Sequence, residues 1–229
     1  MIKKAIILAG GKGERLRPLT YKIPKPLLPF REKEMMIEHI FDSLKKHDIK
    51  DVIFTLCYMP EAFKEKLGNG KKYGLNFQYL LEQEPLGTAG FLNLSPIQET
   101  TLVINSDVFF TNLDITDFYN KHKEFVEKGA IATLALSNIE NTENLGTVKL
   151  DGNRIVNFAE KKNTSNYVNA GHYLLEPPIM NYLPPQKKIM FETDIFPNLA
   201  VKGKLFAYFP KSEWIHIMDL ESYKKLNQK

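Results

Sequence analysis

A glycine-rich segment with several cations follows the first apolar run of the chain. The run Ala5-Ile6-Ile7-Leu8 is typical of a buried strand, and three glycines lie within the four positions from Gly10 to Gly13. Glycine lets a backbone turn sharply and bring its N–H groups close to a ligand, and a row of N–H groups suits phosphate oxygens. The cations of the segment are Lys12, Arg15, Arg17, Lys22 and Lys25, against one carboxylate, Glu14. The combination favours a polyphosphate ligand, although a strand-to-loop turn with solvated basic residues has the same composition.

The spacing of these glycines excludes two common phosphate-binding motifs. The order is G-G-x-G-x-R, whereas the dinucleotide fingerprint requires G-x-G-x-x-G. A Walker A loop ends in G-K-[ST], which is absent here. An ordinary nucleotide-binding oxidoreductase is therefore disfavoured.

A carboxylate follows a second apolar run. Asp107 comes directly after Leu102-Val103-Ile104-Asn105-Ser106, and a carboxylate at this place can hold Mg²⁺ against triphosphate oxygens. An aspartate after a strand also commonly serves as a turn or capping residue. The residues alone leave both roles open.

The stretch as a whole resembles a known signature. The letters L-A-G-G-K-G-E-R-L-R-P-L-T, followed by P-K-P, match the pattern of the sugar-1-phosphate nucleotidyltransferases. The resemblance implies that Arg15 and the loop residues Leu8, Ala9, Gly10, Gly11 and Gly13 hold a triphosphate. It also implies that Lys25 lies at the α-phosphate or the attacking phosphate. Asp107 would bind the metal, although Ser106 stands where the family has glycine.

The segment 82–90 resembles the base-recognition segment of the same family. It reads E-Q-E-P-L-G-T-A-G, close to the E-P-L-G-T-A-G of guanylyltransferases that act on mannose and related sugars. Candidate nucleotide-binding residues here are Glu82, Gln83, Glu84, Gly87, Thr88 and Ala89. A carboxylate can accept the paired donors of guanine, while an amide suits a pyrimidine edge. GTP is the expected triphosphate, but because Glu82, Gln83 and Glu84 are all present, the residues alone do not decide which base is bound.

Three later motifs resemble the sugar-phosphate side of the family. They contribute Gly146 from L-G-T-V, Glu160 and Lys161 from F-A-E-K, and Asn169 and Gly171 from N-A-G. The resemblance implies that Glu160 accepts sugar hydroxyls and that Lys161 holds the sugar phosphate. Lys162 replaces the proline that usually follows.

The resemblance breaks near the end of the chain. The family usually reads W-x-D, with the aspartate as a second Mg²⁺ ligand, but this chain reads Trp214-Ile215-His216. Imidazole is a poor ligand for Mg²⁺ and a better one for Mn²⁺. His216 is thus a further candidate metal ligand, with Mn²⁺ as the alternative cofactor. Asp219 precedes a helical pattern and is expected to be its N-cap.

The elements that must position these residues alternate between strands and helices up to residue 128. Strands are expected at 52–56, 76–81 and 101–105, helices at 35–49, 60–67 and 114–127, and a loop with a helix at 87–94. This pattern predicts an α/β fold with a mainly parallel sheet and helices on both faces, and ligands of such sheets bind at the carboxyl ends of the strands. Further strands are expected at 130–137, 146–150, 154–158 and 167–175, extending the sheet. A further short helix is expected at 191–201 and a strand at 204–209. We expect one domain of the Rossmann-like, GT-A type, with a mainly nucleotide-binding half (1–128) and a mainly sugar-phosphate-binding half (129–229).

Composition sets the remaining expectations. The chain has 229 residues, a formal net charge of +4 and a single cysteine, Cys57. The mild charge does not demand nucleic acid, and one cysteine excludes an intrachain disulfide. No apolar run approaches the ~20 residues of a membrane span. The apolar run at the start of the chain is also too short for the hydrophobic part of a signal peptide. We therefore expect a cytoplasmic protein without nucleic-acid or membrane partners; a homo-oligomer is compatible with the sequence.

The expected activity is transfer of a nucleotidyl group from a nucleoside triphosphate to a sugar 1-phosphate of the mannose or heptose type. Thymidylyl, uridylyl and cytidylyl transfer to another sugar 1-phosphate remain alternatives. A catalytically weak sugar-nucleotide-binding protein on the same fold is a further one, supported only by His216 and Ser106.

Overall fold

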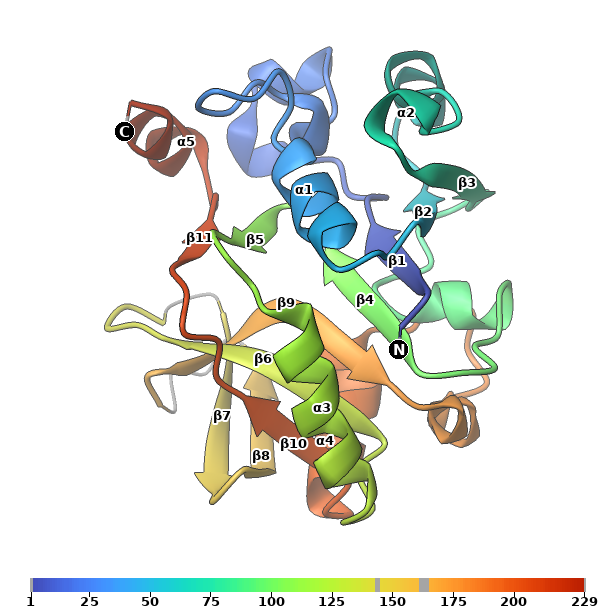
Figure 1. Cartoon of the computed structure of the whole chain (residues 1–229), viewed down its shortest axis with the longest axis vertical. Coiled ribbons are helices and arrows are strands. Elements are labelled where there is room, and N and C mark those ends of the chain that lie inside the picture. The colour runs from blue at the N-terminus through green and yellow to red at the C-terminus, as the bar shows by residue number, and fades with distance from the viewer. Residues whose placement is uncertain (1, 143–144, 161–164, 229) are drawn as a thin grey trace. The chain divides into compact units, whose positions relative to one another are not determined.

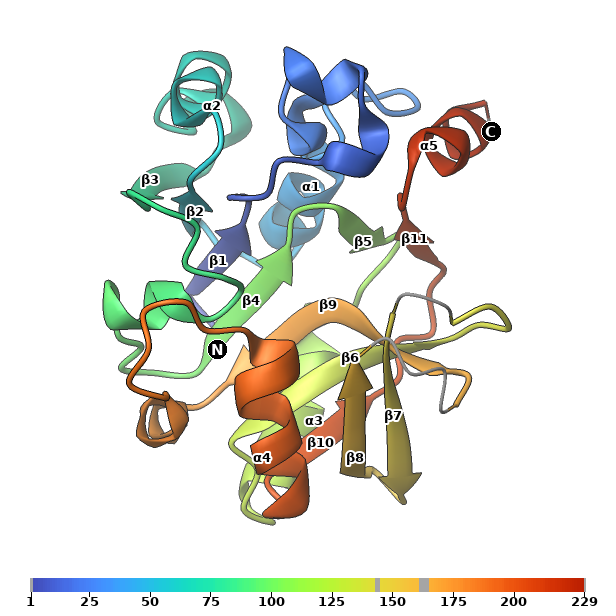
Figure 2. The same cartoon turned by 180° about the vertical axis from the view of Figure 1, so that it is seen from behind.

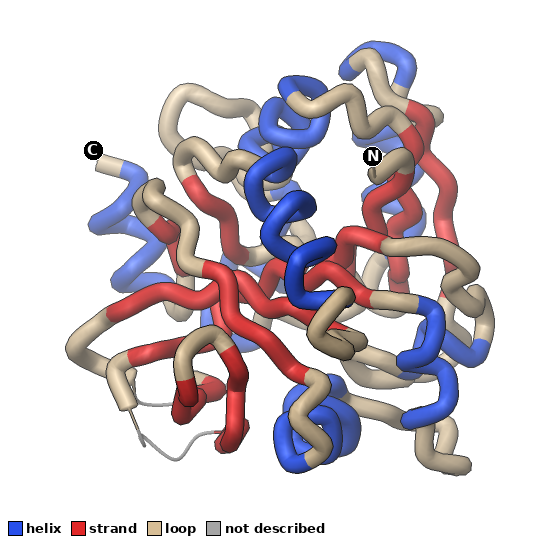
Figure 3. The backbone as a smooth tube through the Cα atoms, turned by 60° about the horizontal axis from the view of Figure 1, so that its bottom comes forward, coloured by secondary structure: helices blue, strands red, loops and turns tan. Residues whose placement is uncertain are grey.

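The computed structural model describes residues 2–142, 145–160 and 165–228. The chain divides into two compact units. We call residues 3–85, 104–112 and 213–229 the glycine-loop unit, and Ile2, 86–103 and 113–212 the barrel unit. Both units contain helices and strands (Figure 3), so the expected α/β character is confirmed.

Parallel strands form the centre of the glycine-loop unit. Strands β1 (Lys4–Leu8), β2 (Asp51–Leu56) and β3 (Asn76–Leu81) pair in parallel. The last residues of β4 (Thr101–Asn105) lead to Ser106, whose amide donates to the Leu8 carbonyl at 3.1 Å. The carboxyl ends of β1 and β4 are therefore neighbours in this unit.

Aromatic packing holds the helices of this unit to its strands. Phe41 of α1 (Glu38–Lys46) meets Phe54 of β2 and Phe77 of β3, with ring centroids 6.3 and 5.0 Å away. Phe63 of α2 (Pro60–Leu67) contacts the same Phe54 at 6.2 Å. Burying such aromatic rings removes a large apolar area from water, which stabilises the layer.

Helix α1 begins three residues later than the apolar spacing predicts. The amides of Met36 and Ile37 donate to the carbonyls of Leu28 and Pro26 at 2.8 and 3.0 Å. These donors hold the preceding loop, so the helix starts at Glu38. The predicted helix Pro60–Leu67 has the observed bounds of α2.

A small antiparallel pair completes the glycine-loop unit. Strand β5 (Val108–Phe110) pairs with β11 (Trp214–His216), and His216 stands opposite Val108. Helix α5 (Leu220–Asn227) follows, and Asp219 caps it by accepting from the Ser222 amide at 2.8 Å. The expected N-cap is confirmed.

The strands of the barrel unit curl into a small closed barrel. The strands are β6 (Ala132–Asn138), β7 (Gly146–Asp151), β8 (Arg154–Glu160), β9 (Tyr167–Leu175) and β10 (Leu205–Tyr208). Their order is β9-β6-β10-β8-β7, and β7 pairs back with β9 at Thr147 and Val168. Of these pairs, β6–β10 is parallel and the others are antiparallel. The mainly parallel arrangement expected from the sequence is thus seen among β1–β3 and not here.

Two helices flank this barrel on opposite sides. Helix α3 (Ile115–Val126) lies in front of β6 and β10 in Figure 1, and α4 (Phe196–Val201) lies in front of the strands in the reverse view of Figure 2. A π turn, Phe191–Ile195, leads into α4, where the sequence predicts one continuous helix. Among the described residues, no helix has the length and apolar character needed to cross a bilayer.

Candidate active site

The glycine loop begins where β1 ends. The Ala9 amide donates to the Thr55 carbonyl at 3.0 Å, so the chain stays in the sheet until Gly10. Gly13 has a φ of 60°, and a Cβ there would lie 3.0 Å from Thr20 Cγ2. The Thr20 hydroxyl donates to the Gly13 carbonyl at 2.8 Å. A side chain at position 13 would therefore be strained and crowded, which explains the glycine.

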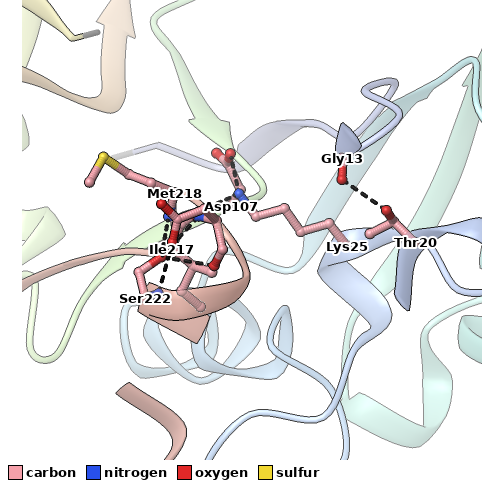
Figure 4. A network of polar contacts seen from close by, with 8 residues as sticks. Gly13, Thr20, Lys25, Asp107, Ile217, Met218 and Ser222 are labelled. Atoms are coloured by element: carbon pink, nitrogen blue, oxygen red, sulfur yellow. Dashed lines mark hydrogen bonds and ion pairs between the residues drawn. The ribbon is translucent and has the colours of Figure 1, made fainter. Parts of the chain in front are cut away.

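Lys25 and Asp107 form the central ion pair of the glycine-loop unit. Lys25 Nζ donates to Asp107 Oδ2 at 2.8 Å and to the Ile217 carbonyl (Figure 4). Lys25 is only 5% exposed, while about a third of the Asp107 side chain, 33%, is exposed. Lys25 begins a short 3-10 turn after Pro24, and Asp107 lies in the tight turn between β4 and β5. A buried cation beside a partly exposed carboxylate can hold both a phosphate and a metal ion.

Charges around Asp107 keep it ionised. Burial alone would raise the pKa of Asp107, but the charges of Lys25 and Arg15 and the hydrogen bond from Lys25 outweigh it and hold the pKa below its ordinary value. Arg15 is exposed and lies on the short turn Glu14–Leu16 of the glycine loop. The three predicted catalytic residues Arg15, Lys25 and Asp107 are thus brought together in one unit.

His216 joins this group from β11. Its ring stacks on Trp214 with centroids 4.9 Å apart, as expected of residues two positions apart, which lie on the same face of a strand. Burial lowers the pKa of His216 to about 4; Asp107 raises it, and Lys25 and Arg15 lower it. The imidazole is therefore neutral at pH 7 and able to offer a lone pair.

The donor set fits a metal ion that arrives with a triphosphate. No group of three His, Cys, Asp or Glu residues able to hold a metal occurs in the described part of the chain. Mg²⁺ in nucleotide sites is commonly held by one or two carboxylates, substrate phosphates and water. Asp107 meets that requirement, while His216 suits Mn²⁺ better than Mg²⁺.

The three polar residues after β3 differ in where they lie. The Glu82 amide donates to the Leu56 carbonyl at 2.8 Å, and Glu82 Oε2 lies 3.8 Å from the place a Cβ on Gly10 would occupy. Glu82 is half-buried, whereas Gln83 and Glu84 are exposed. Of the three, Glu82 is the residue that the structure brings to the glycine loop.

The predicted nucleotide-binding residues Gly87, Thr88 and Ala89 belong to the barrel unit. Thr88 donates its hydroxyl to Glu192 Oε2 at 2.6 Å, and the Phe191 amide donates to Thr88 Oγ1 at 2.9 Å. Glu192 carries no signal in the sequence, because an acidic residue near the start of a helix is common. The hydroxyl of Thr88 thus bonds within the protein.

Two predicted sugar-side residues meet at the start of β7. Gly146 stands opposite Glu160 of β8 in the register, and a Cβ on Gly146 would lie 2.8 Å from Glu160 Oε2. The close approach places the Glu160 carboxylate directly against the β7 backbone. Glu160 is partly exposed and can accept hydroxyl groups there.

Asn169 and Gly171 shape an irregularity in β9. The Gly171 amide donates to Asn169 Oδ1 at 3.1 Å, Asn169 Nδ2 donates to the Tyr173 hydroxyl at 2.9 Å, and the φ of Gly171 is 73°. The register with β6 shifts at this point. Bulges of this kind re-aim side chains next to binding sites. Lys161, the predicted phosphate ligand, lies outside the described residues.

Comparison with known proteins agrees with this arrangement. A sequence model of the family described as "Nucleotidyl transferase" matches residues 4–229. A mannose-1-phosphate guanyltransferase from Yarrowia lipolytica is 33% identical over 226 residues, which cover 93% of this chain and 60% of the relative. A UTP–glucose-1-phosphate uridylyltransferase from Synechocystis is 30% identical over 241 residues, covering 96% of the chain and 61% of that protein. The chain therefore spans about three fifths of the length of these relatives.

A solved structure matches over the full chain. It is a presumed glucose-1-phosphate thymidylyltransferase from Bacillus anthracis, with a TM-score of 0.83 and 25% identity, covering 100% of this chain and 94% of that one. The family match, the relatives and this fold agree with the resemblance that the motifs carry. The chain belongs to the nucleotidyl transferase family.

Proposed function

We propose that the chain transfers a nucleotidyl group from GTP to a sugar 1-phosphate of the mannose type, forming a nucleotide-diphospho-sugar and pyrophosphate. The observation that carries the proposal is the Lys25–Asp107 ion pair, with Nζ 2.8 Å from Oδ2, near enough to Arg15 of the glycine loop for the charge of Arg15 to lower the pKa of Asp107. Relatives named mannose-1-phosphate guanyltransferase support the substrates. The proposed sugar 1-phosphate is of the mannose or the heptose type.

In the proposed reaction, an oxygen of the sugar phosphate attacks the α-phosphorus of the triphosphate. A new P–O bond forms as the bond to the bridging oxygen of the β-phosphate breaks, and pyrophosphate leaves with that electron pair. Little covalent chemistry falls to the protein, so positioning and charge neutralisation supply the acceleration. Arg15 and the loop N–H groups would hold the triphosphate, and Lys25 would neutralise charge at the phosphates.

Asp107, with His216 as a further ligand, would hold the divalent cation. The cation, Mg²⁺ or Mn²⁺, supplies neutralisation of developing charge on the phosphate oxygens. Its proposed ligand Asp107 is kept ionised by Lys25 and Arg15, against the opposing effect of burial. Activity that survives thorough chelation would exclude this part of the proposal.

Glu82 is the proposed reader of the base, because it is half-buried and approaches Gly10. Guanine presents N1–H and N2–H donors, which one carboxylate can accept together. Glu160, Lys161, Gly146, Asn169 and Gly171 are the proposed sugar-phosphate residues. The parallel strands β1–β3 support a Rossmann-like nucleotide half of the GT-A type.

A cytoplasmic location and a role in polysaccharide precursor synthesis complete the proposal. Nucleoside triphosphates are the substrates that such a compartment supplies, and the one cysteine, Cys57, is free.

Pyrophosphate release with a matrix of triphosphates and sugar phosphates tests the proposal. GTP, UTP, dTTP and CTP are each combined with mannose, glucose and heptose 1-phosphates, with and without chelator. We expect the highest kcat/KM for GTP with mannose or heptose 1-phosphate, and no metal-dependent release from Asp107→Asn. Higher activity with UTP or dTTP would mean that this triphosphate, and not GTP, is the nucleotide substrate. No release with any pair would contradict the activity itself.

A further inference from the structure

A buried carboxyl group is hydrogen-bonded to the middle residue of the segment Gly87–Ala89. Glu192 is 9% exposed, and its Oε2 accepts the hydroxyl of Thr88 at 2.6 Å. The same hydroxyl oxygen accepts from the Phe191 amide at 2.9 Å. A hydroxyl group has a single proton, and that of Thr88 is donated to Glu192.

The backbone of the segment is held on the same side. The Ala89 amide donates to the Ile189 carbonyl at 2.9 Å, and the Ile189 amide donates to the Leu86 carbonyl at 2.8 Å. Gly87 has a φ of 83°, and a Cβ there would lie 2.4 Å from the Ile189 carbonyl oxygen. Residues 86–89 and 189–192 therefore form one closely fitted pair of segments in the barrel unit.

Glu192 lies in the π turn Phe191–Ile195, a conformation that is rare and often occurs at functional sites. A second carboxylate fixes the turn, since Asp194 Oδ2 accepts from the Met190 amide at 2.8 Å. Burial raises the pKa of Glu192; the hydrogen bond from Thr88 lowers it, and the charges of Glu160 and Asp194 raise it. Glutamine has the same size and keeps an oxygen that can accept the Thr88 hydroxyl, so it is the conservative replacement.

We infer that Glu192 is a positioning residue: through the Thr88 hydroxyl it fixes Gly87–Ala89 in the shape that receives the nucleoside triphosphate. The inference rests on the proposed function, because it takes up the expectation that this segment, which resembles the base-recognition segment of the family, receives the triphosphate. Stability alone does not call for this pair, since replacing both buried polar partners by apolar groups of similar shape is commonly neutral or stabilising. A loop that must keep one conformation gains from the directionality of the bond.

The test separates the bond from the fold. Thr88→Val keeps the shape of the side chain and removes the hydroxyl. We expect the Kd for GTP, measured by calorimetry, and the KM for GTP to rise about tenfold, while the KM for the sugar 1-phosphate changes less than about twofold. Glu192→Leu should match Thr88→Val, and Thr88→Ser and Glu192→Gln should restore wild-type values because each keeps the hydrogen bond. If Glu192→Leu does not fold, Thr88→Val with its serine rescue carries the test.

A matched control lies in the same unit. The Thr100 hydroxyl donates to Glu176 Oε1 at 2.5 Å, a bond of the same type outside the predicted substrate motifs. Thr100→Val should lower the thermal midpoint without changing the Kd or KM for GTP.

The outcomes distinguish this inference from the proposed function. An active wild-type enzyme whose Kd for GTP is unchanged in Thr88→Val, or rises equally in Thr100→Val, overturns the positioning role alone. A wild-type protein that binds GTP and releases no pyrophosphate overturns the proposed reaction alone, and the Kd of Thr88→Val still decides the positioning role. A wild-type protein that binds no triphosphate overturns both.

Discussion

The ammonium group of Lys25 is hydrogen-bonded to two acceptors of the protein. Asp107 and the Ile217 carbonyl accept two of the three ammonium donors. Both partners fix the position of the ammonium group, and the carboxylate offsets the cost of burying its charge. The side chain is therefore oriented before any phosphate arrives, which is the kind of preorganisation that lowers a transition-state barrier.

Lys25→Met tests this arrangement at the scale of one residue. Methionine keeps much of the length and apolar stem and removes the charge, so kcat/KM should fall by ~10²-fold or more. The thermal midpoint should fall slightly, because Asp107 loses its partner. Steady-state pyrophosphate release and calorimetry measure the two effects.

The control is Lys33→Met, which removes the ion pair of Lys33 with Asp42, at 2.5 Å, on the surface of the same unit. Exposed pairs contribute little, so the control should leave both kcat/KM and the midpoint near wild type. A Lys25→Met enzyme within a few-fold of wild type would contradict the proposed role of the charge.

His216 gives a second prediction at this scale, since the sequence resemblance implies a carboxylate at the position of this imidazole. His216→Asp adds a hard oxygen ligand beside Asp107, which suits Mg²⁺. The Mg²⁺ concentration for half-maximal rate should fall, and the advantage of Mn²⁺ should shrink. Metal titrations of both proteins measure this. An unchanged metal requirement would assign His216 another role.

Each member of the ion pair could be predicted from the sequence, but their contact could not. Lys25 and Asp107 belong to separate local motifs, and 82 positions separate them in the chain. The Ile217 carbonyl has no sequence signal, because a backbone acceptor is common to every residue. Glu192 was missed for a related reason, since only its burial against Thr88 distinguishes it from a surface carboxylate.

At the scale of the element, β9 contains a histidine that is almost fully buried. His172 is 3% exposed, and burial lowers its pKa from 6.5 to about 4, although the hydrogen bond with the Ala170 carbonyl raises it. Above pH 6.5 the ring is neutral in both the folded and the unfolded state. As the pH falls from 6.5 towards 4, the unfolded chain takes up a proton that the folded chain does not, so the free energy of unfolding decreases.

His172→Gln should remove this contribution from β9. Between pH 7 and pH 4, the wild type should lose on the order of 3 kcal/mol more unfolding free energy than the variant. Urea unfolding at a series of pH values gives the difference curve, in which carboxylates and His216 cancel because both proteins share them. Parallel curves for the two proteins would mean that the ring is protonated in the folded state.

Most elements follow from local pattern, and the exceptions have local causes. The β-branched and aromatic runs predicted β2 and β3, because such residues fit a buried pleated surface. Strand β5 has only three residues, Val108–Phe110, and depends on pairing with β11 from the far end of the chain. The loop 87–94 was expected to contain a helix, but only a short 3-10 turn, Gly90–Asn93, forms.

At the scale of the whole molecule, closure of the barrel was not predictable from the sequence. Each strand of the barrel could be predicted from its own residues. The pattern of apolar residues does not reveal, however, whether β7 ends a sheet or pairs back with β9 through Thr147 and Val168. The two compact units are also interleaved along the chain, because residues 86–103 group with the barrel strands and 213–229 with the glycine loop. We propose which residues bind the nucleotide and which bind the sugar phosphate; the two compact units do not by themselves assign these roles.

Two carboxylates in different units test that division. Glu82 belongs to the glycine-loop unit and Glu160 to the barrel unit. Glu82→Gln turns one of its two acceptor oxygens into a donor, so it should lower kcat/KM for GTP by about tenfold or more relative to UTP and dTTP. Glu160→Gln should raise the KM for the sugar 1-phosphate by a similar factor and leave base preference unchanged.

Measuring both variants against both substrates makes the test reciprocal, since each serves as the control for the other. Both replacements preserve side-chain size, and thermal midpoints near the wild-type value would show that neither unfolds its unit. A change in base preference caused by Glu160→Gln would contradict the division, as would a sugar effect confined to Glu82→Gln. The reciprocal pattern is expected because a neutral amide offers one carbonyl oxygen and two N–H donors, so it alters only the partner that the carboxylate held.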